Sequence, residues 1–193
     1  MTEEVQKLFI TPDSLRHDSV AVARQLYDAG YHPNRIIGLW RGGSPIGLYV
    51  HEALKVLGVR ADYIPVITRG YKEGIDNPLA RVVVQGIDSL AGMTRKQDRV
   101  LVVDDVWDSG RSIDAFFDVF QAVTGENFPD EVRVATVYYK PDIKLGRYKS
   151  QRKPDYFIHE TDQWLVFPHE FSDCSSEELT QHFGTGIAGL LKN

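Results

Sequence analysis

The sequence contains one cysteine, Cys174, in 193 residues, so no internal disulfide can form. A chain without disulfides is typical of a reducing compartment, and we expect a cytoplasmic protein. The six histidines are scattered and lack the spacing of a zinc site. The start, residues 1–4, is acidic without a signal-peptide pattern, and no run approaches the roughly eighteen apolar residues of a membrane span. We therefore expect no membrane partner.

Positive charge is also scarce. The formal net charge is -5, and the basic cluster at residues 144–153 is modest and fits a solvated loop. We therefore expect no nucleic-acid partner. Hydrophobic residues make up 42% of the chain and charged residues 25%, which is ordinary for a globular protein. Since the chain is long enough for one buried core and shows no clear linker, we expect residues 1–193 to form a single domain.

Apolar patterns predict strands that alternate with helices along the chain. The expected strands are 8–10, 35–40, 63–67, 81–85, 100–103, 132–139, 156–158 and 164–167. Helical or helix-like segments are expected to begin near Thr11, Ser44, Asp88, Ser112 and Ser175. This alternation predicts an α/β fold with a parallel sheet and helices on both faces. In such sheets ligands bind at the carboxyl ends of the strands.

Residues 100–112 combine a buried strand with an acidic turn. The strand, 100–103, consists of four aliphatic residues, and three carboxylates follow at Asp104, Asp105 and Asp108. Residues 109–112 then lead into a helical pattern, with Ser112 as the expected N-cap. A helix start attracts an anion, so a phosphate bound there beside two carboxylates suggests a sugar phosphate. The alternative, acids that only cap and solvate a helix, explains one aspartate but not three.

This stretch resembles the phosphoribosyl-pyrophosphate (PRPP) signature of the type I phosphoribosyltransferases. In that family four apolar residues and two acids precede a small-residue phosphate loop. The resemblance implies that Asp104 and Asp105 hold the ribose diol directly or through Mg²⁺, and that Asp108 takes the proton from N7 of a purine. It also implies a 5′-phosphate site made of Ser109, Gly110, Arg111 and Ser112. Arg111 stands where many members have glycine, and we expect it to add charge for the phosphate.

A second strand-to-helix turn, residues 41–44, contains two glycines that let backbone N–H groups approach an anion. By itself it would be a plain tight turn. Beside the PRPP-like motif it resembles the family's diphosphate loop, which implies a diphosphate site at Arg41, Gly42 and Gly43. The polar stretch 68–78 is similar to the family's mobile lid, with Tyr71 as its expected contact. The alternative is a connection without a role.

Two further residues resemble the base site of the family's 6-oxopurine branch. Lys140 follows a long strand, where a lysine in that branch donates to the exocyclic oxygen of the base. Trp164 would stack on the purine, with Leu165 presenting backbone atoms to it. Without the resemblance these would be a solvated lysine and a core tryptophan. Glu170 is similar to an acid near a second metal, so the implied metal ligands are Asp104, Asp105 and Glu170.

The resemblance therefore implies a core at about 15–140 and a small hood over the base site, formed by about 141–175 with the N-terminal residues. The implied activity transfers the 5-phosphoribosyl group from PRPP to hypoxanthine, guanine or xanthine, with Mg²⁺ as cofactor, in a homodimer or homotetramer. One alternative is a PRPP- or nucleotide-sensing regulator on the same fold, which would need a basic face for RNA. Another is a phosphoribosyltransferase for an unusual base, since segment 142–160 is long. Which 6-oxopurine is preferred stays open.

Overall fold

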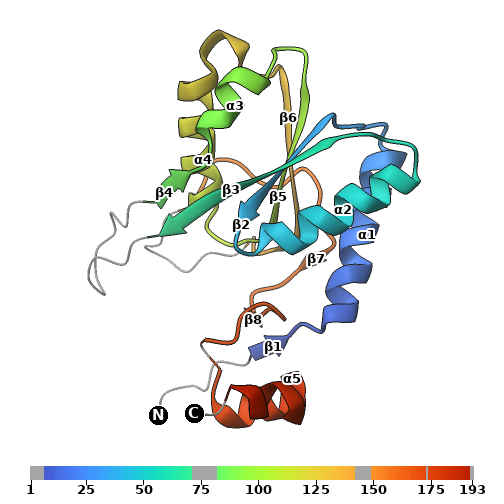
Figure 1. Cartoon of the computed structure of the whole chain (residues 1–193), viewed down its shortest axis with the longest axis vertical. Coiled ribbons are helices and arrows are strands. Elements are labelled where there is room, and N and C mark those ends of the chain that lie inside the picture. Colours follow the sequence, from blue (N-terminus) through green and yellow to red (C-terminus); the bar gives the residue numbers. More distant parts are fainter. Residues whose placement is uncertain (1–6, 71–81, 142–148, 173, 192–193) are drawn as a thin grey trace.

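The computed structural model of the chain describes residues 7–70, 82–141, 149–172 and 174–191. Its centre is a six-stranded sheet in which all neighbouring strands are parallel except β3 and β4. Figure 1 shows these strands twisting across the upper part of the molecule. Their order is β4 (Val82–Gln85), β3 (Asp62–Gly70), β2 (Arg35–Trp40), β5 (Arg99–Trp107), β6 (Glu131–Tyr139) and β7 (His159–Glu160).

Helices cover both faces of this sheet. Helices α1 (Pro12–Asp28) and α2 (Gly43–Val56) pack on one face, where Leu101 and Val103 of β5 point. Helices α3 (Asp88–Met93) and α4 (Arg111–Thr124) pack on the other face, against Val100 and Val102, and a short 3₁₀ helix η1 (Gly125–Asn127) follows α4. Because side chains alternate along a strand, the aliphatic run of β5 supplies both cores. The predicted α/β fold is confirmed.

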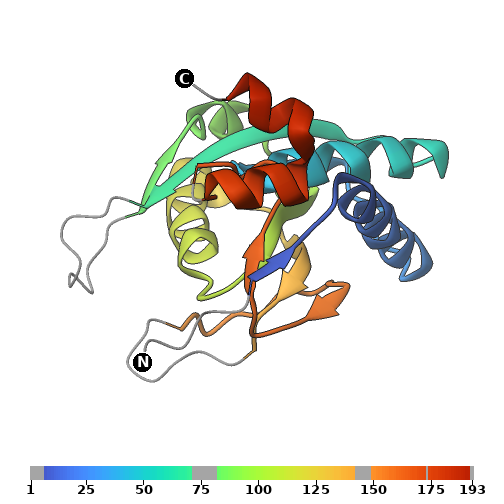
Figure 2. The ribbon, with the colours of Figure 1, turned by 90° about the horizontal axis from the view of Figure 1, so that it is seen from below.

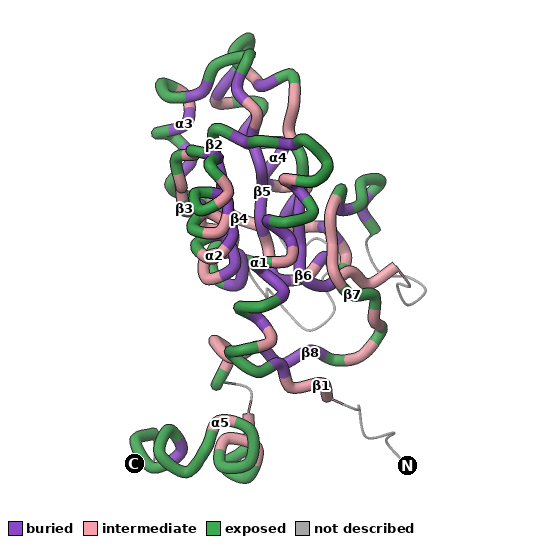
Figure 3. Tube along the Cα trace, turned by 90° about the vertical axis from the view of Figure 1, so that its right-hand side faces the viewer, coloured by how far each residue is buried: buried purple, intermediate pink, exposed green. Residues whose placement is uncertain are grey.

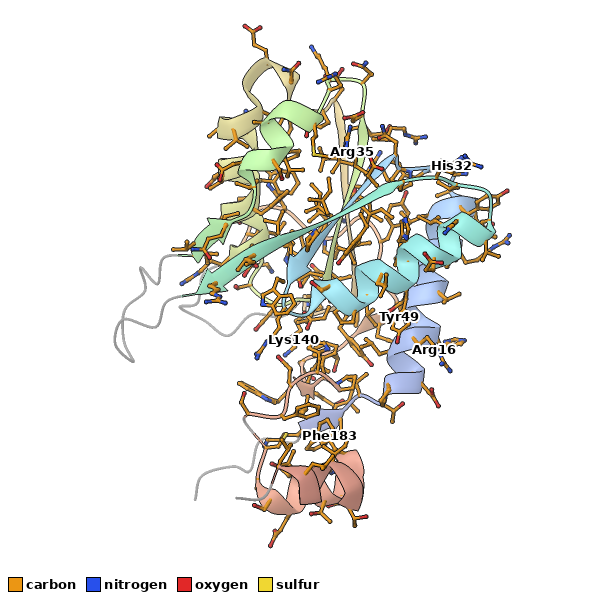
Figure 4. The ribbon with its side chains drawn as sticks, in the orientation of Figure 1. Arg16, His32, Arg35, Tyr49, Lys140 and Phe183 are labelled. Carbon is orange, nitrogen blue, oxygen red and sulfur yellow. The ribbon has the colours of Figure 1, made fainter. Side chains whose placement is uncertain are left out.

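The lower part of the molecule is a second, smaller layer, which we call the hood. It consists of β1 (Lys7–Phe9), β8 (Trp164–Val166) and α5 (Ser176–Leu190), with β1 and β8 paired in parallel. Phe9 stacks on His182 of α5 with 3.6 Å between ring centroids, and Phe183 lies at the same contact between α5 and β1 (Figure 4). Seen from below, the hood lies in front of the carboxyl ends of the central strands (Figure 2). The central strands are buried, whereas α5 is largely exposed (Figure 3).

Several predicted boundaries are wrong, because strand pairing and the geometry of the turns, and not the apolar run alone, decide where an element begins and ends. The strand predicted at 100–103 continues through Asp104 to Trp107, because β6 pairs with it as far as Tyr139. The turn tightens at Gly110, so α4 begins at Arg111, and Ser112 is not its N-cap. Similarly, α2 begins at Gly43 and has no side-chain cap, so Ser44 does not cap it. The predicted strand 156–158 is reduced to one isolated bridge beside β7.

Within the described part of the chain, no helix is both long and apolar enough to cross a membrane. The helix predicted to begin near Ser175 does begin there, with a capping box in which the Ser175 side chain accepts from the Glu178 backbone N–H while the Glu178 side chain accepts from the Ser175 N–H. This box fixes the start of α5 next to the hood strands.

Candidate active site

The acidic residues of the sequence motif lie at the carboxyl end of β5. Asp105 is buried, and its Oδ1 accepts from the Val106 N–H at 2.7 Å. Asp104 Oδ1 accepts from the Asp105 N–H at 3.1 Å. Burial and the neighbouring Asp105 charge raise the pKa of Asp104 well above its usual range. The pair is therefore costly to ionise without a cation.

The glycine turn after β2 packs directly against this pair, because β2 and β5 are adjacent parallel strands that end side by side. Gly42 and Gly43 are buried, while Arg41 is exposed. A β-carbon on Gly42 would overlap the Asp105 carboxylate, and one on Gly43 would overlap the Val103 carbonyl oxygen. The two glycines are needed here for close approach, as a loop that wraps an anion requires. The Trp40–Arg41 peptide bond at the start of this turn is cis.

The predicted phosphate turn joins β5 to α4. Gly110 has φ = 78°, the left-handed region that favours glycine, and it packs against the Trp107 ring and Ser150. The Ser109 hydroxyl accepts from the Arg111 N–H at 3.4 Å, so the turn closes on itself ahead of the helix. Because α4 begins immediately after Gly110, the positive end of its helix dipole lies at this turn, where an anion is favoured.

Two cavities meet at this end of the sheet. The first, of about 490 Å³, is polar and contains the predicted diphosphate and ribose residues. It is lined by Trp40, Arg41, Gly42, Thr68, Arg69, Gly70, Asp104, Asp105, Ser112 and Glu170. The second, of about 270 Å³, contains the predicted base residues, and Lys140 lies at the end of the sheet facing the hood (Figure 4). It is lined by Lys7, Asp105, Val106, Asp108, Lys140, Trp164, Leu165, Val166, Phe167, Glu170 and Cys174.

Asp105 and Glu170 line both cavities and, with His169, form a cluster of metal-ligating side chains. One donor atom each from Asp105, His169 and Glu170 lie within 4.8 Å of one another, and His169 Nε2 is 3.3 Å from Asp105 Oδ2. Burial, and then the Asp105 charge, raise the pKa of Glu170. Carboxylates gathered at such distances fit a divalent cation, since a cation offsets their mutual repulsion. Two of the three ligands that the resemblance implies, Asp105 and Glu170, belong to this cluster, whereas His169 stands there in place of Asp104. The two carboxylates fit Mg²⁺, which prefers oxygen ligands.

Most of the predicted site residues that the structure describes line one of the two cavities, but Gly43, Ser109, Gly110 and Arg111 line neither and lie in the two turns beside them. Three further residues had no signal in the sequence. His169 joins the acid cluster, and Lys7 and Cys174 line the second cavity. Cys174, which the sequence left without a role, donates weakly to the Glu170 carbonyl at 3.6 Å. Only the long-range pairing of β1 with β8 brings Lys7 here, and no local pattern carries that information. The predicted lid contact Tyr71 lies outside the described residues.

Residues 14–175 match the family described as the phosphoribosyl transferase domain. The chain belongs to this family. The match spans the acidic strand, both glycine turns and the hood strand β8, so it confirms the predicted family. No curated protein matches the chain in sequence.

Solved structures of phosphoribosyltransferases share the fold. A purine phosphoribosyltransferase from Pyrococcus horikoshii is 24% identical, with a TM-score of 0.65 over 88% of this chain and 97% of that chain. A hypothetical protein from Neisseria gonorrhoeae with bound ppGpp is 22% identical, with a TM-score of 0.68 over 98% and 99%. The xanthine-guanine-hypoxanthine phosphoribosyltransferase of Helicobacter pylori is 16% identical, with a TM-score of 0.61 over 84% and 92%. At these identities the likeness establishes a common fold.

Proposed function

We propose that the protein transfers the 5-phosphoribosyl group from PRPP to a 6-oxopurine, giving the nucleoside monophosphate and diphosphate. The observation that carries the proposal is the pair of adjoining cavities, one lined by anion-binding turns and carboxylates and the other by Asp108, Lys140 and Trp164. The first suits a phosphorylated, diphosphate-bearing ribose, and the second suits a flat base. Asp105 and Glu170 at their junction mark where the two substrates would meet.

The ribose and its phosphates would occupy the polar cavity. The 5′-phosphate would lie on the turn from Ser109 to Ser112, where the start of α4 offers N–H donors. The diphosphate would lie against Arg41 and the amides of Gly42 and Gly43. As the bond at C1′ breaks, negative charge grows on the leaving diphosphate, and these donors stabilise it. Bound Mg²⁺ would neutralise the carboxylates and the diphosphate oxygens together.

The base would occupy the second cavity. Asp108 is exposed at its wall, where a carboxylate can accept the purine N7 proton as N9 attacks C1′. Lys140 follows β6, and its ammonium can only donate, so it favours the O6 acceptor of a 6-oxopurine over the 6-amino group of adenine. Trp164 has 53% of its surface exposed, which is high for a tryptophan and leaves its ring available for stacking. Leu165 follows it in β8, is buried, and would present backbone atoms to the base.

The direct test is product formation from PRPP and Mg²⁺ with adenine, hypoxanthine, guanine, xanthine, orotate and uracil in separate reactions. We expect nucleoside monophosphate from the 6-oxopurines, little from adenine, and none from the two pyrimidines. Transfer to orotate or uracil in preference to purines would reject the base assignment. Absence of transfer to every base would reject the catalytic assignment.

A second candidate function is nucleotide sensing. It is favoured by one comparison, in which the Neisseria gonorrhoeae protein with bound ppGpp aligns over 98% of this chain. A guanosine polyphosphate carries both a purine and the phosphate groups for which the two cavities are suited. Titration calorimetry with ppGpp separates the two candidates. Tight binding without phosphoribosyl transfer would favour a sensor, whereas competition between ppGpp and PRPP in an active enzyme would favour inhibition of the proposed reaction.

A further inference from the structure

The second cavity, which we assign to the base, is lined by two lysines, and Lys7 reaches it from a different part of the fold than Lys140 does. Lys140 follows β6 of the central sheet, whereas Lys7 is the first residue of β1 in the hood. The register of the β1–β8 pair places Lys7 directly beside Trp164. Residues opposite each other on neighbouring strands project from the same face, about 5 Å apart. Lys7 therefore lies next to the ring on which we expect the purine to stack.

The Lys7 ammonium is held in position. Its Nζ donates to Glu178 Oε1 at 2.7 Å, and the other Glu178 oxygen, Oε2, accepts from the Ser175 backbone N–H at 2.8 Å. Glu178 thus connects Lys7 to the capping box that begins α5. Lys7 keeps 31% of its side chain exposed, and it lines the cavity. Lys7 therefore brings an ammonium group, which can only donate hydrogen bonds, to this side of the cavity.

The orientation of a bound purine follows from the proposed function, on which this inference rests. N9 must face the ribose site beside Asp104 and Asp105, N7 faces Asp108, and O6 faces Lys140. With the face of the ring stacked on Trp164, the opposite edge, which carries C2 and N3, then points toward Lys7. The 6-oxopurines differ at this edge. Hypoxanthine has hydrogen at C2, guanine has an amino donor, and xanthine has a carbonyl acceptor.

We infer that Lys7 selects the substituent at C2, and that the preferred base is a 2,6-dioxopurine such as xanthine. An ammonium can only donate, so it attracts the 2-oxo group and repels the 2-amino group of guanine. Two cations, Lys7 and Lys140, then match the two carbonyl oxygens of one base. Hypoxanthine offers Lys7 nothing to bind and should be intermediate.

The test compares kcat/KM for xanthine, hypoxanthine and guanine in the wild type and in Lys7→Met. The wild type should rank xanthine first and guanine last. Lys7→Met should lower the xanthine-to-hypoxanthine ratio by about 10- to 100-fold, the worth of one hydrogen bond to a charged group. In Lys7→Arg the xanthine-to-hypoxanthine ratio should stay close to that of the wild type, because arginine keeps the positive charge and the hydrogen-bond donors. Thermal melting of each variant checks that the fold is intact.

A purely structural role for Lys7 gives a different result. Glu178→Gln removes the ion pair with α5 but leaves the ammonium, so it separates the two roles. If Lys7 only fastens β1 to α5, Glu178→Gln and Lys7→Met will lower kcat/KM for all three bases alike, and the inference is overturned. It is also overturned if the wild type prefers guanine, or if Lys7→Met leaves the xanthine-to-hypoxanthine ratio unchanged while transfer persists. Absence of transfer to any purine would instead reject the proposed function, and the inference with it.

Discussion

Replacing Gly42 by alanine tests how much the close contact between the predicted diphosphate loop and Asp105 contributes to PRPP binding. A β-carbon on Gly42 would lie 2.6 Å from Asp105 Oδ1 and closer still to Cγ and Oδ2. The carboxylate must therefore move. It is held by the Val106 N–H at 2.7 Å and faces His169 Nε2 at 3.3 Å, so moving it breaks the first contact and lengthens the second.

The expected cost has two parts. Overpacking a buried site costs about 1–3 kcal/mol, and losing a hydrogen bond to a charged group costs about 1.5–3 kcal/mol. Part of this cost will appear as lower stability, and part as weaker binding of PRPP with Mg²⁺. If about 2.7 kcal/mol falls on binding, the dissociation constant rises about 100-fold. Isothermal titration of PRPP in Mg²⁺ buffer measures the binding part, and thermal melting measures the stability part.

Gly70→Ala is the matched control. Gly70 lines the same cavity, yet a β-carbon there would meet no atom of the described residues within 4 Å. We expect Gly70→Ala to bind PRPP within about threefold of the wild type, as surface substitutions usually change free energies by less than about 0.5 kcal/mol. Wild-type PRPP affinity in Gly42→Ala, or equal losses in the two variants, would refute the argued role of the Gly42–Asp105 contact.

Three further predictions address the chemistry, the base pocket and the acid cluster. Asp108→Asn should retain PRPP affinity by calorimetry but lower kcat by about two to four orders of magnitude, the usual worth of a general base; near-native turnover would exclude Asp108. In steady-state assays Lys140→Ala should lower the ratio of kcat/KM for hypoxanthine to kcat/KM for adenine. Trp164→Ala should weaken the binding of all purines equally, by roughly 1–3 kcal/mol. An unchanged ratio in Lys140→Ala would contradict the role given to Lys140 in the base pocket. Since the folded-state pKa of Glu170 is raised, its stabilising contribution is present below the unfolded pKa of about 4.3 and is lost as pH rises through the folded pKa. In EDTA, Glu170→Gln should therefore melt at a higher temperature than the wild type at about pH 7 and at the same temperature at about pH 4; a lower melting temperature at pH 7 would contradict the cause given for the shift.

The strands and helices around β5 could be predicted from the sequence because their signals are local. Four aliphatic residues predict a buried strand, and the polar turn after them predicts a helix start. The end of β5 could not be placed, because aspartates are typical of loops. In the protein Asp104 and Asp105 remain in the strand, since β6 supplies its hydrogen-bond partners as far as Trp107. The sequence therefore predicted Asp104 and Asp105 in a turn, whereas the protein keeps both in a strand.

The hood could be predicted only in part. The resemblance indicated that a C-terminal segment and N-terminal residues lie over the base, and β1 and β8 do pair. The pairing joins Lys7 to Trp164, far apart in the chain, so its register depends on tertiary packing and not on local propensity. The contribution of α5, through Glu178 and the stack of His182 on Phe9, had no sequence signal beyond its capping box. The expected homodimer or homotetramer stays a prediction.

The most direct test of the central claim is a competition in one tube between hypoxanthine and adenine for a limiting amount of PRPP. The two nucleoside monophosphates are separated by chromatography, and released diphosphate is measured in the same sample. The account predicts one diphosphate per nucleotide formed, and an excess of inosine over adenosine monophosphate of about four orders of magnitude, as expected of a site built around one hydrogen bond to the base. Comparable amounts of the two nucleotides, or diphosphate released without either, would contradict it.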